Sequence, residues 1–323
     1  MARVPLGWLS DFGWERGRLV MRETGVRLAV DRHVLAELGH WLIYLVVLGC
    51  AWGLGRLRRR RPLAILFAPQ RARPWYLARG AALWTGVRSA RREADADIAF
   101  YFEDATVGAP SPSRLPVLNG GCVNISKSHA AAVFERVFGR RLRLDPRVAQ
   151  GDIVEKSERN GVHDGRVITG PCLPRPGRVY QRCIDSADGA GVCRDLRTVC
   201  VGGRPVVVWE KEKPAGSRFS INNRRATLRE PADVFSAVER EAIGRFCDAM
   251  GLDWGGLDIL RDRGDGQIYI VDVNKTDLGP VVALSWPDKI RSMARLGAAL
   301  RGLIAARLAA AAETFPRRET ETA

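Results

Sequence analysis

The most apolar stretch of the chain lies at residues 38–55, which contain no Lys, Arg, Asp or Glu, and the basic run RLRRRR follows at residues 56–61. About 18 apolar residues are the short end of what crosses a bilayer as a helix, and basic residues beyond it stay on the cytoplasmic side. We therefore expect a membrane-associated helix, which makes a membrane a candidate partner through residues 38–61. Two other interpretations remain: a helix that docks on the catalytic body, and a non-functional leader from an upstream start codon. Deletion of residues 1–61 is expected to leave a soluble, active protein.

A different pattern of short apolar runs follows between residues 62 and 117. Residues 63–67 and 97–102 read as buried strands, and residues 75–90 between them read as a helix. This order of strand, helix and strand predicts a small α/β lobe. The Pro- and Ser-rich segment APSPSRLP closes the lobe near residue 116, as expected of a linker.

The rest of the chain predicts a larger mixed domain at residues 118–315, with a tail at 316–323. A helix is expected at residues 126–138, where Ser126 or Ser128 would begin it and Gly139 would end it. Further helices are expected at residues 231–250 and 290–312, and the clearest strands at 152–156, 166–169, 178–184, 196–201, 256–261 and 267–274. The predicted fold class is therefore α+β, preceded by the small lobe and the extension 1–61.

Composition changes this picture in two ways. The net charge of +15 suggests a nucleic-acid or membrane partner, but only six of the 51 basic residues are Lys. No aromatic residues interleave with the basic ones, so we interpret the charge as compositional bias and expect no nucleic-acid partner. Five of the six Lys fall between residues 127 and 275, either by chance or because a tight phosphate site needs a compact ammonium: Lys127, Lys156, Lys211, Lys213 and Lys275. Seven Cys without a CxxC pair argue against a zinc site and favour a reducing, cytoplasmic compartment.

The strongest chemical signal is the segment GLDILRDRGDGQIYIVDVNKTDLGP, in which two strands flank a Gly-Asp-Gly turn. Asp272 and Asn274 share one face of the second strand. A three-residue turn places Asp258 directly opposite Asp272, whereas a four-residue turn places it opposite Val271 unless a bulge intervenes. Two carboxylates and an amide oxygen on one face predict a site for a hard cation such as Mg²⁺. The alternative is an exposed acidic hairpin.

This segment resembles the last two strands of the ATP-grasp superfamily, which includes D-alanine–D-alanine ligase and the glutathione synthetases. That family has an Asp on one strand and Glu-x-Asn on the next, followed by a Pro/Gly turn; here the positions are Asp258, Asp272 and Asn274, then Gly279-Pro280. The resemblance implies that these three residues bind Mg²⁺, or Mn²⁺, with ATP held between two α+β lobes. Asp272 in place of Glu is one methylene shorter, which could favour one metal ion over two.

Segments further upstream follow the family in order. The strand around Lys156 and the loop 157–165 resemble the family's nucleotide Lys and mobile phosphate loop; His163 in that loop is interpreted as a surface residue. Residues 180–184 resemble the adenine hinge, and Arg197 the Arg of an Asp-x-Arg motif. The resemblance implies cofactor-binding roles for Lys127, Lys156, Gln181, Cys183, Ile184, Asp185 and Lys211, and catalytic roles for Lys156 and Arg197.

The implied activity is an ATP- and magnesium-dependent ligase, in which a substrate carboxylate becomes an acyl phosphate and an amine or another nucleophile then attacks it. One departure concerns the acceptor: related peptide ligases often carry an oxyanion-stabilising Arg where this chain has Gly256. Its role could pass to Arg224, Arg225 or Lys211, or the acceptor could differ. Two alternatives remain, a phosphotransferase on the same fold and a membrane-attached nucleotide-binding module without turnover.

Overall fold

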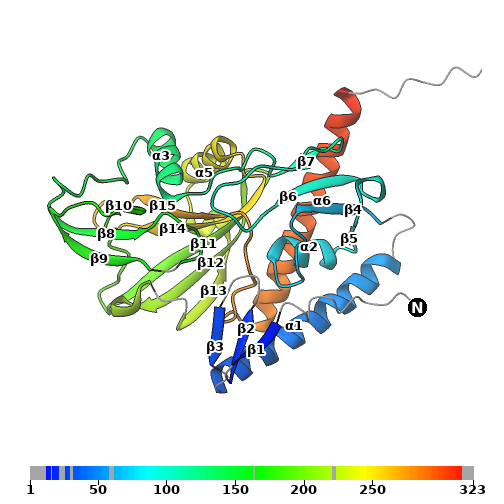
Figure 1. Ribbon diagram of the computed structural model, residues 1–323, viewed down its shortest axis with the longest axis horizontal. Helices are drawn as coiled ribbons and strands as arrows, with labels where there is room; N and C mark the ends of the chain where they lie inside the picture. The colour runs from blue at the N-terminus through cyan, green and yellow to red at the C-terminus, as the bar shows by residue number, and fades with distance from the viewer. Residues whose placement is uncertain are drawn as a thin grey trace, which may run out of the picture.

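A computed structural model describes residues 12–15, 17–21, 26–29, 32–57, 62–162, 164–219 and 223–314 (Figure 1). The tail 316–323, His163 and the last four residues of the basic run 56–61 lie outside the described residues. Four β-sheets and the helices packed on them form an elongated molecule, with β8–β10 at one end and α1 at the other. The prediction of a mixed fold with an apolar N-terminal helix is confirmed.

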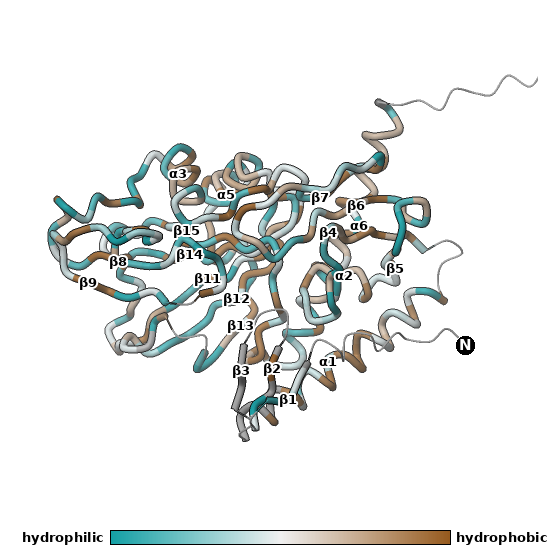
Figure 2. The backbone as a smooth tube through the Cα atoms, in the orientation of Figure 1, coloured by the Kyte–Doolittle hydropathy of each residue, from teal (hydrophilic) through white to brown (hydrophobic). Residues whose placement is uncertain are grey.

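The N-terminal part holds a small antiparallel sheet and a long helix. Strands β1 (Phe12–Glu15), β2 (Arg18–Met21) and β3 (Val26–Ala29) precede α1 (Arg32–Leu57). Helix α1 is hydrophobic or neutral over most of its length (Figure 2), and it is the one described helix long and apolar enough to cross a membrane. One side of it nevertheless packs on the body, because Tyr44 and Leu48 are buried in the larger of two hydrophobic cores.

The small α/β lobe is a four-stranded parallel sheet with order β5-β4-β6-β7. Its elements are β4 (Ala64–Pro69), α2 (Leu77–Trp84), β5 (Arg88–Ser89), the short 3-10 helix Glu93–Asp95, β6 (Ile98–Phe102) and β7 (Val117–Leu118). The helix predicted at 75–90 is too long, because Gly86 has a φ of 73° and the chain after it turns into β5. Strand β7 follows the Pro- and Ser-rich segment and still pairs with β6.

A three-stranded antiparallel sheet, order β10-β8-β9, forms the next layer. Its strands are β8 (Gly151–Ser157), β9 (Arg166–Gly170) and β10 (Arg178–Arg182). Helix α3 (Lys127–Phe138) begins as predicted, since the Ser126 side chain accepts a hydrogen bond from the His129 amide, and it ends at Gly139 in the left-handed conformation. The core side of α3 packs against β15 and α5.

The largest sheet has five strands in the order β13-β12-β11-β14-β15. They are β11 (Val192–Val201), β12 (Arg204–Pro214), β13 (Arg225–Arg229), β14 (Trp254–Arg261) and β15 (Ile268–Asn274), with the 3-10 turn Ala215–Ser217 after β12. The helix predicted at 231–250 is two helices, α4 (Pro231–Val234) and α5 (Ala237–Met250). The break follows from a capping box in which Ser236 and Glu239 satisfy each other's backbone amides.

The two faces of this sheet have different partners. On one face, Leu196, Val208 and Leu257 pack under α3 and α5. On the other, Val199 and Trp209 pack against the small lobe and α6 (Trp286–Thr314). Because side chains alternate along a strand, Arg197 and Lys211 lie on this second face, beyond the apolar part. The candidate site is built there.

Candidate functional site

The hairpin of β14 and β15 places Asp258 opposite Asp272, but not in the way that a three-residue turn would. The Asp262 amide donates to the Gln267 carbonyl at 2.9 Å, which closes a four-residue turn and corrects the predicted Gly-Asp-Gly turn. The register then shifts by one residue between Asp258 and Ile259, so that Val271 has no partner on β14. This is the bulged alternative, and it returns Asp258 to the face of Asp272.

The bulge also supplies a contact for Lys156. Its Nζ donates to the Val271 carbonyl at 3.1 Å, which ties β8 of the three-stranded sheet to β15 of the five-stranded sheet. Burial lowers the pKa of Lys156 to about 8, and the nearby carboxylate of Asp272 offsets part of that shift. Lys156 thus sits between the two sheets as an ammonium at neutral pH and loses its proton above about pH 8.

Lys127 approaches the same carboxylate from α3. Its Nζ lies 3.6 Å from Oδ1 of Asp272 and donates to the Arg159 carbonyl at 3.2 Å. As the first residue of α3, Lys127 adds its charge to the positive end of the helix dipole. Lys127 and Lys156 therefore both face Asp272, and their combined charge exceeds that of its single carboxylate.

Arg197 pairs with two carboxylates, those of Asp258 and Asp277. Its Nη1 donates to Oδ1 of Asp258 at 3.0 Å, and its Nη2 pairs with Oδ1 of Asp277. Burial opposes ionisation of Asp258, but Arg197 and Lys211 hold the pKa of that carboxyl well below its usual range. Asp277 behaves differently: burial raises its pKa to about 6, and its Oδ2 has no hydrogen-bond partner among the described residues.

A second Lys pair lies next to Arg197 on β12. Lys211 Nζ lies 2.8 Å from Oδ2 of Asp195 and 3.4 Å from Oδ1 of Asp258, while Lys213 Nζ lies 3.8 Å from Oδ2 of Asp195. Burial works against the charge on Lys211, yet the two carboxylates raise the pKa of its ammonium above the usual value. Basic and acidic side chains therefore alternate closely across β11, β12 and β14.

The space beside Gly256 on β14 is occupied by a side chain from the neighbouring strand. A Cβ placed on Gly256 would lie 2.7 Å from Nε of Arg197 and would clash with the carboxylate of Asp277. The side chain of Arg197, from the neighbouring strand, thus fills the space in front of residue 256. The predicted substitutes Arg224 and Arg225 belong to the segment at the start of β13, where the Arg224 amide pairs with the Glu212 carbonyl.

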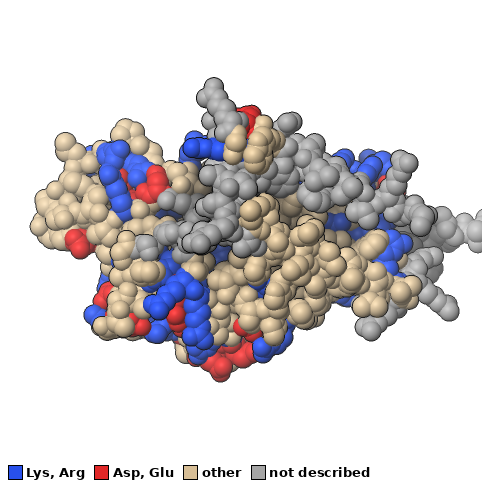
Figure 3. Space-filling view, turned by 90° about the horizontal axis from the view of Figure 1, so that it is seen from below, with Lys and Arg blue, Asp and Glu red and all other residues tan. Residues whose placement is uncertain are grey.

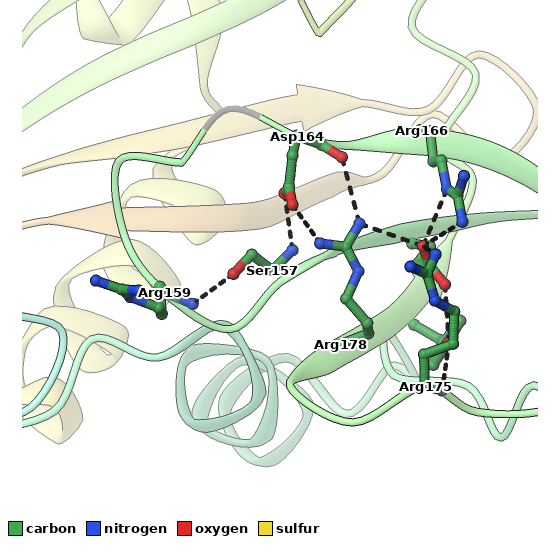
Figure 4. A network of polar contacts seen from close by, with 8 residues as sticks. Ser157, Arg159, Asp164, Arg166, Arg175 and Arg178 are labelled. Atoms are coloured by element: carbon green, nitrogen blue, oxygen red, sulfur yellow. Dashed lines mark hydrogen bonds and ion pairs between the residues drawn. The ribbon is translucent and has the colours of Figure 1, made fainter. Parts of the chain in front are cut away.

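In the predicted phosphate loop, residues 157–165, Gly161 has a φ of 75° and the anchoring side chain is that of Asp164 (Figure 4). Its Oδ1 accepts from the Ser157 amide at 3.0 Å, and its carboxylate pairs with Arg178 of β10. The Arg159 amide donates to Oγ of Ser157 at 3.2 Å. Behind the loop, the buried carboxylate of Glu155 accepts from Tyr180, Arg166, Arg175 and Arg178. These contacts anchor both ends of the loop to the three-stranded sheet.

The predicted adenine hinge leaves β10 toward β11. Gln181 is buried in the ladder, with Val154 opposite it. The Ile184 carbonyl accepts from Nη2 of Arg218 at 2.6 Å, and Nη1 of Arg218 reaches the sulfur of Cys183. Asp185 turns away to the β14–β15 turn, where its carbonyl accepts from the Arg263 amide at 2.7 Å. Arg218 was not identified from the sequence, which holds 45 Arg residues and no motif around this one.

The oxygen atoms at this site decide whether it could hold a divalent cation. Among the described residues, no group of three His, Cys, Asp or Glu residues is arranged to hold a metal ion. Asp258, Asp272 and Asn274 offer two carboxylates and one amide oxygen instead, and no hydrogen bond between described residues engages Oδ2 of either Asp. Oδ1 of Asn274 accepts from Thr276. This set fits a cation that takes its remaining ligands from phosphate and water, as Mg²⁺ does with nucleotides.

Lys275 does not belong to this site. Its Nζ lies over the ring of Tyr101, 4.3 Å from the centroid, and 3.5 Å from the Cys122 carbonyl. Burial lowers the pKa of this ammonium. For Lys275 the structure favours chance placement over a phosphate-binding role, because its side chain is fully enclosed between the small lobe and the main domain.

No protein-family model and no curated protein matches the sequence. Solved structures of ATP-grasp ligases are similar to the chain. One is the RiPP-associated ATP-grasp ligase of Chryseobacterium gregarium in complex with ADP and a leader and core peptide (12% identity, 74% of this chain and 97% of that chain, TM-score 0.45). Another is D-alanine–D-alanine ligase of Bacillus anthracis complexed with ATP (13% identity, 79% and 99%, TM-score 0.44). The match to the ATP-grasp ligase PsnB complexed with a precursor variant, Mg and ADP has 16% identity and a TM-score of 0.40; it covers 60% of this chain and 62% of PsnB, less than two thirds of that protein.

Proposed function

We propose that the chain is an ATP-dependent ligase of the ATP-grasp type that activates a carboxylate. The observation that carries this proposal is the convergence of acidic and basic side chains on one face of β14 and β15. Asp258 lies opposite Asp272. Arg197 and Lys211 pair with Asp258, and Lys127 pairs with Asp272. The motifs that resemble the ATP-grasp superfamily, which come from three separate segments of the sequence, meet at this point.

The charges support a polyphosphate as the ligand. Lys127 and Lys156 surround the single carboxylate of Asp272, whereas the cations beside Asp258 are balanced by Asp277 and Asp195. Buried cations in excess of their acid partners are costly unless an anion joins them. The phosphates of ATP would supply that anion, and they would free the carboxylates to act as metal ligands.

When bound, Mg²⁺ would neutralise charge on the transferring phosphoryl group. Asp258, Asp272 and Asn274 would hold it. Lys156 and Lys127 would orient the phosphates from the side of β8 and α3. Arg197, fixed between Asp258 and Asp277, would present its guanidinium to the substrate carboxylate or to the acyl oxygen.

The reaction has two steps. A carboxylate oxygen of the substrate bonds to the γ-phosphorus as the bond to the bridging oxygen breaks, which gives an acyl phosphate and ADP. An amine or other nucleophile then attacks the acyl carbon, inorganic phosphate leaves, and the nucleophile gives up its proton. Both steps require positive charge near oxygen and the exclusion of water.

The test is ADP release by the full-length protein with ATP, Mg²⁺ and a panel of carboxylates, with and without amines. Hydroxamate formation in hydroxylamine is expected with the correct carboxylate. Asp272→Ala and Lys156→Ala are expected to abolish turnover with an unchanged circular dichroism spectrum, and Asp233→Ala in α4 serves as the matched control. Full activity in either site variant contradicts the assignment.

Product analysis separates the alternatives. A stable phosphorylated alcohol without hydroxamate identifies a phosphotransferase on the same site. ATP and Mg²⁺ binding without ADP release for any acceptor identifies a nucleotide-binding module without turnover. Either result overturns the ligase proposal.

A further inference from the structure

Helix α1 has two apolar sides, and only one of them is used inside the molecule. Tyr44 is 4% exposed and Leu48 is 1% exposed, and both pack on the body. At 100° per residue, Leu42, Val46 and Leu57 lie on the opposite side. They are 66%, 59% and 85% exposed. An ordinary surface helix would carry polar residues at these positions.

The contacts of α1 with the body fix the orientation of the helix. Tyr44 donates a hydrogen bond to the sulfur of Met293 in α6 at 3.4 Å. Two residues from its end, the backbone of Gly55 touches that of Gly86, where an added Cβ would come within 2.8 Å of the Gly86 nitrogen. His40, nearer its start, stacks on Trp286. Since α1 contacts the body at points between His40 and Gly55, it cannot cross a bilayer without leaving these partners.

The exposed side of α1 forms a continuous apolar strip. Seen from the side of α1, the surface shows a broad band without Lys, Arg, Asp or Glu, with both basic and acidic groups at its margins (Figure 3). The band continues into a groove of about 720 Å³ between α1, α2 and α6, lined by Leu54, Trp84, Ala298 and Arg301 among others. An exposed apolar surface that is continuous over several turns is typical of an interaction site.

We propose that this strip, defined as Leu38, Leu42, Ile43, Val46, Leu54 and Leu57, binds the surface of an anionic membrane with α1 lying in the plane of the bilayer interface. The basic cluster next to the strip selects this partner. Arg56 lies at the end of α1, and residues 58–61 add four more Arg in sequence. Such a charge attracts anionic headgroups, while the apolar strip enters the acyl boundary. Two copies of the chain would instead bring like charges together.

This inference is independent of the proposed ligase activity. The sequence predicted a membrane-associated helix without deciding whether it spans; the proposal is a helix that lies at the interface and keeps its contacts to α2 and α6. The groove beside Leu54 gives an acyl chain a place to lie, and Arg301 at that groove suits a phosphate headgroup.

The experiment is sedimentation of the full-length protein with vesicles of phosphatidylcholine, alone or with one-third phosphatidylglycerol. We expect binding to the anionic vesicles, weakened by salt, and weak binding to the neutral ones. Leu42→Glu and Val46→Glu should each reduce binding at least about tenfold, since each removes a leucine- or valine-sized contact. Their melting temperatures should not change. Val238→Glu, an equally exposed apolar position on α5, is the matched control and should bind like the wild type.

Three outcomes overturn the proposal. The first is equal binding of the wild type and Leu42→Glu, or equal binding to both kinds of vesicle. The second is a dimer in lipid-free buffer that Leu42→Glu dissociates, without vesicle binding, which assigns the strip to a second copy. The third is vesicle-bound protein that resists extraction at alkaline pH, which identifies a spanning helix.

Discussion

The guanidinium of Arg197 occupies the space that a side chain at Gly256 would need, on the adjacent strand of the same sheet. The absence of a side chain at residue 256 therefore leaves room for a guanidinium from β11. Asp277 holds the other end of that guanidinium.

Gly256→Ala is expected to displace Arg197, because the added Cβ would lie 2.7 Å from its Nε and closer still to Asp277. Turnover should fall at least about tenfold, since a small misplacement of a catalytic group is costly. The check is steady-state ADP release. Gly189→Ala, where an added Cβ meets nothing within 4 Å, is the matched control. Unchanged turnover in Gly256→Ala would show that the position of Arg197 does not matter.

The pH dependence of ATP use is expected to report Lys156. Burial lowers its pKa to about 8, so the ammonium that attracts phosphate is present below pH 8 and lost above it. The ratio kcat/KM for ATP, which reports the free enzyme, should therefore fall by up to about tenfold per pH unit above 8. Lys156→Arg keeps its charge and should remove this inflection.

Lys289→Arg is the control for that profile, because burial also lowers the pKa of Lys289 although it lies on α6, bonded to the Val282 carbonyl. The inflection should persist in this variant. A profile for the wild type that is flat between pH 7 and 9 contradicts the role of Lys156.

Lys275 is expected to matter for stability and not for ATP binding. Its buried ammonium contacts Tyr101 of the small lobe and the Cys122 carbonyl, so Lys275→Met should cost about 1–3 kcal/mol of unfolding free energy. Urea denaturation measures that loss. KM for ATP should stay within about twofold of the wild type, because Lys275 lies outside the candidate site. A large rise in KM without loss of stability would return Lys275 to the phosphate site.

The sequence predicted the elements whose signals are local. The helix α3 and its ends follow from Ser126 and Gly139, and the strands β8 and β14 follow from short apolar runs. The position of Asp258 opposite Asp272 was also predicted, but only as one of several possible strand registers. A hydrogen bond at Asp262 and a bulge at Val271 decide between them, and neither has a residue signature in the sequence.

Contacts between distant segments were the part that could not be predicted. Asp277 meets Arg197 across 80 positions of sequence, and its role depends on the empty space at Gly256. Arg218 reaches the hinge across 34 positions. The pattern of a chain records which residues are apolar or charged, whereas such pairings depend on how the strands are ordered in the sheet.

The side of α1 that faces the body is expected to stabilise the fold, contrary to the interpretation of residues 1–61 as a removable leader. Leu48 is buried in the larger core, so Leu48→Ala should lower the unfolding free energy by about 2–5 kcal/mol. Leu42→Ala, six residues earlier on the exposed side of the same helix, should change it by less than about 0.5 kcal/mol. Deletion of residues 1–61 should then produce a destabilised protein, because it uncovers the surface of α2 and α6. Equal stability of the two leucine variants in urea would place α1 outside the core and restore the leader interpretation.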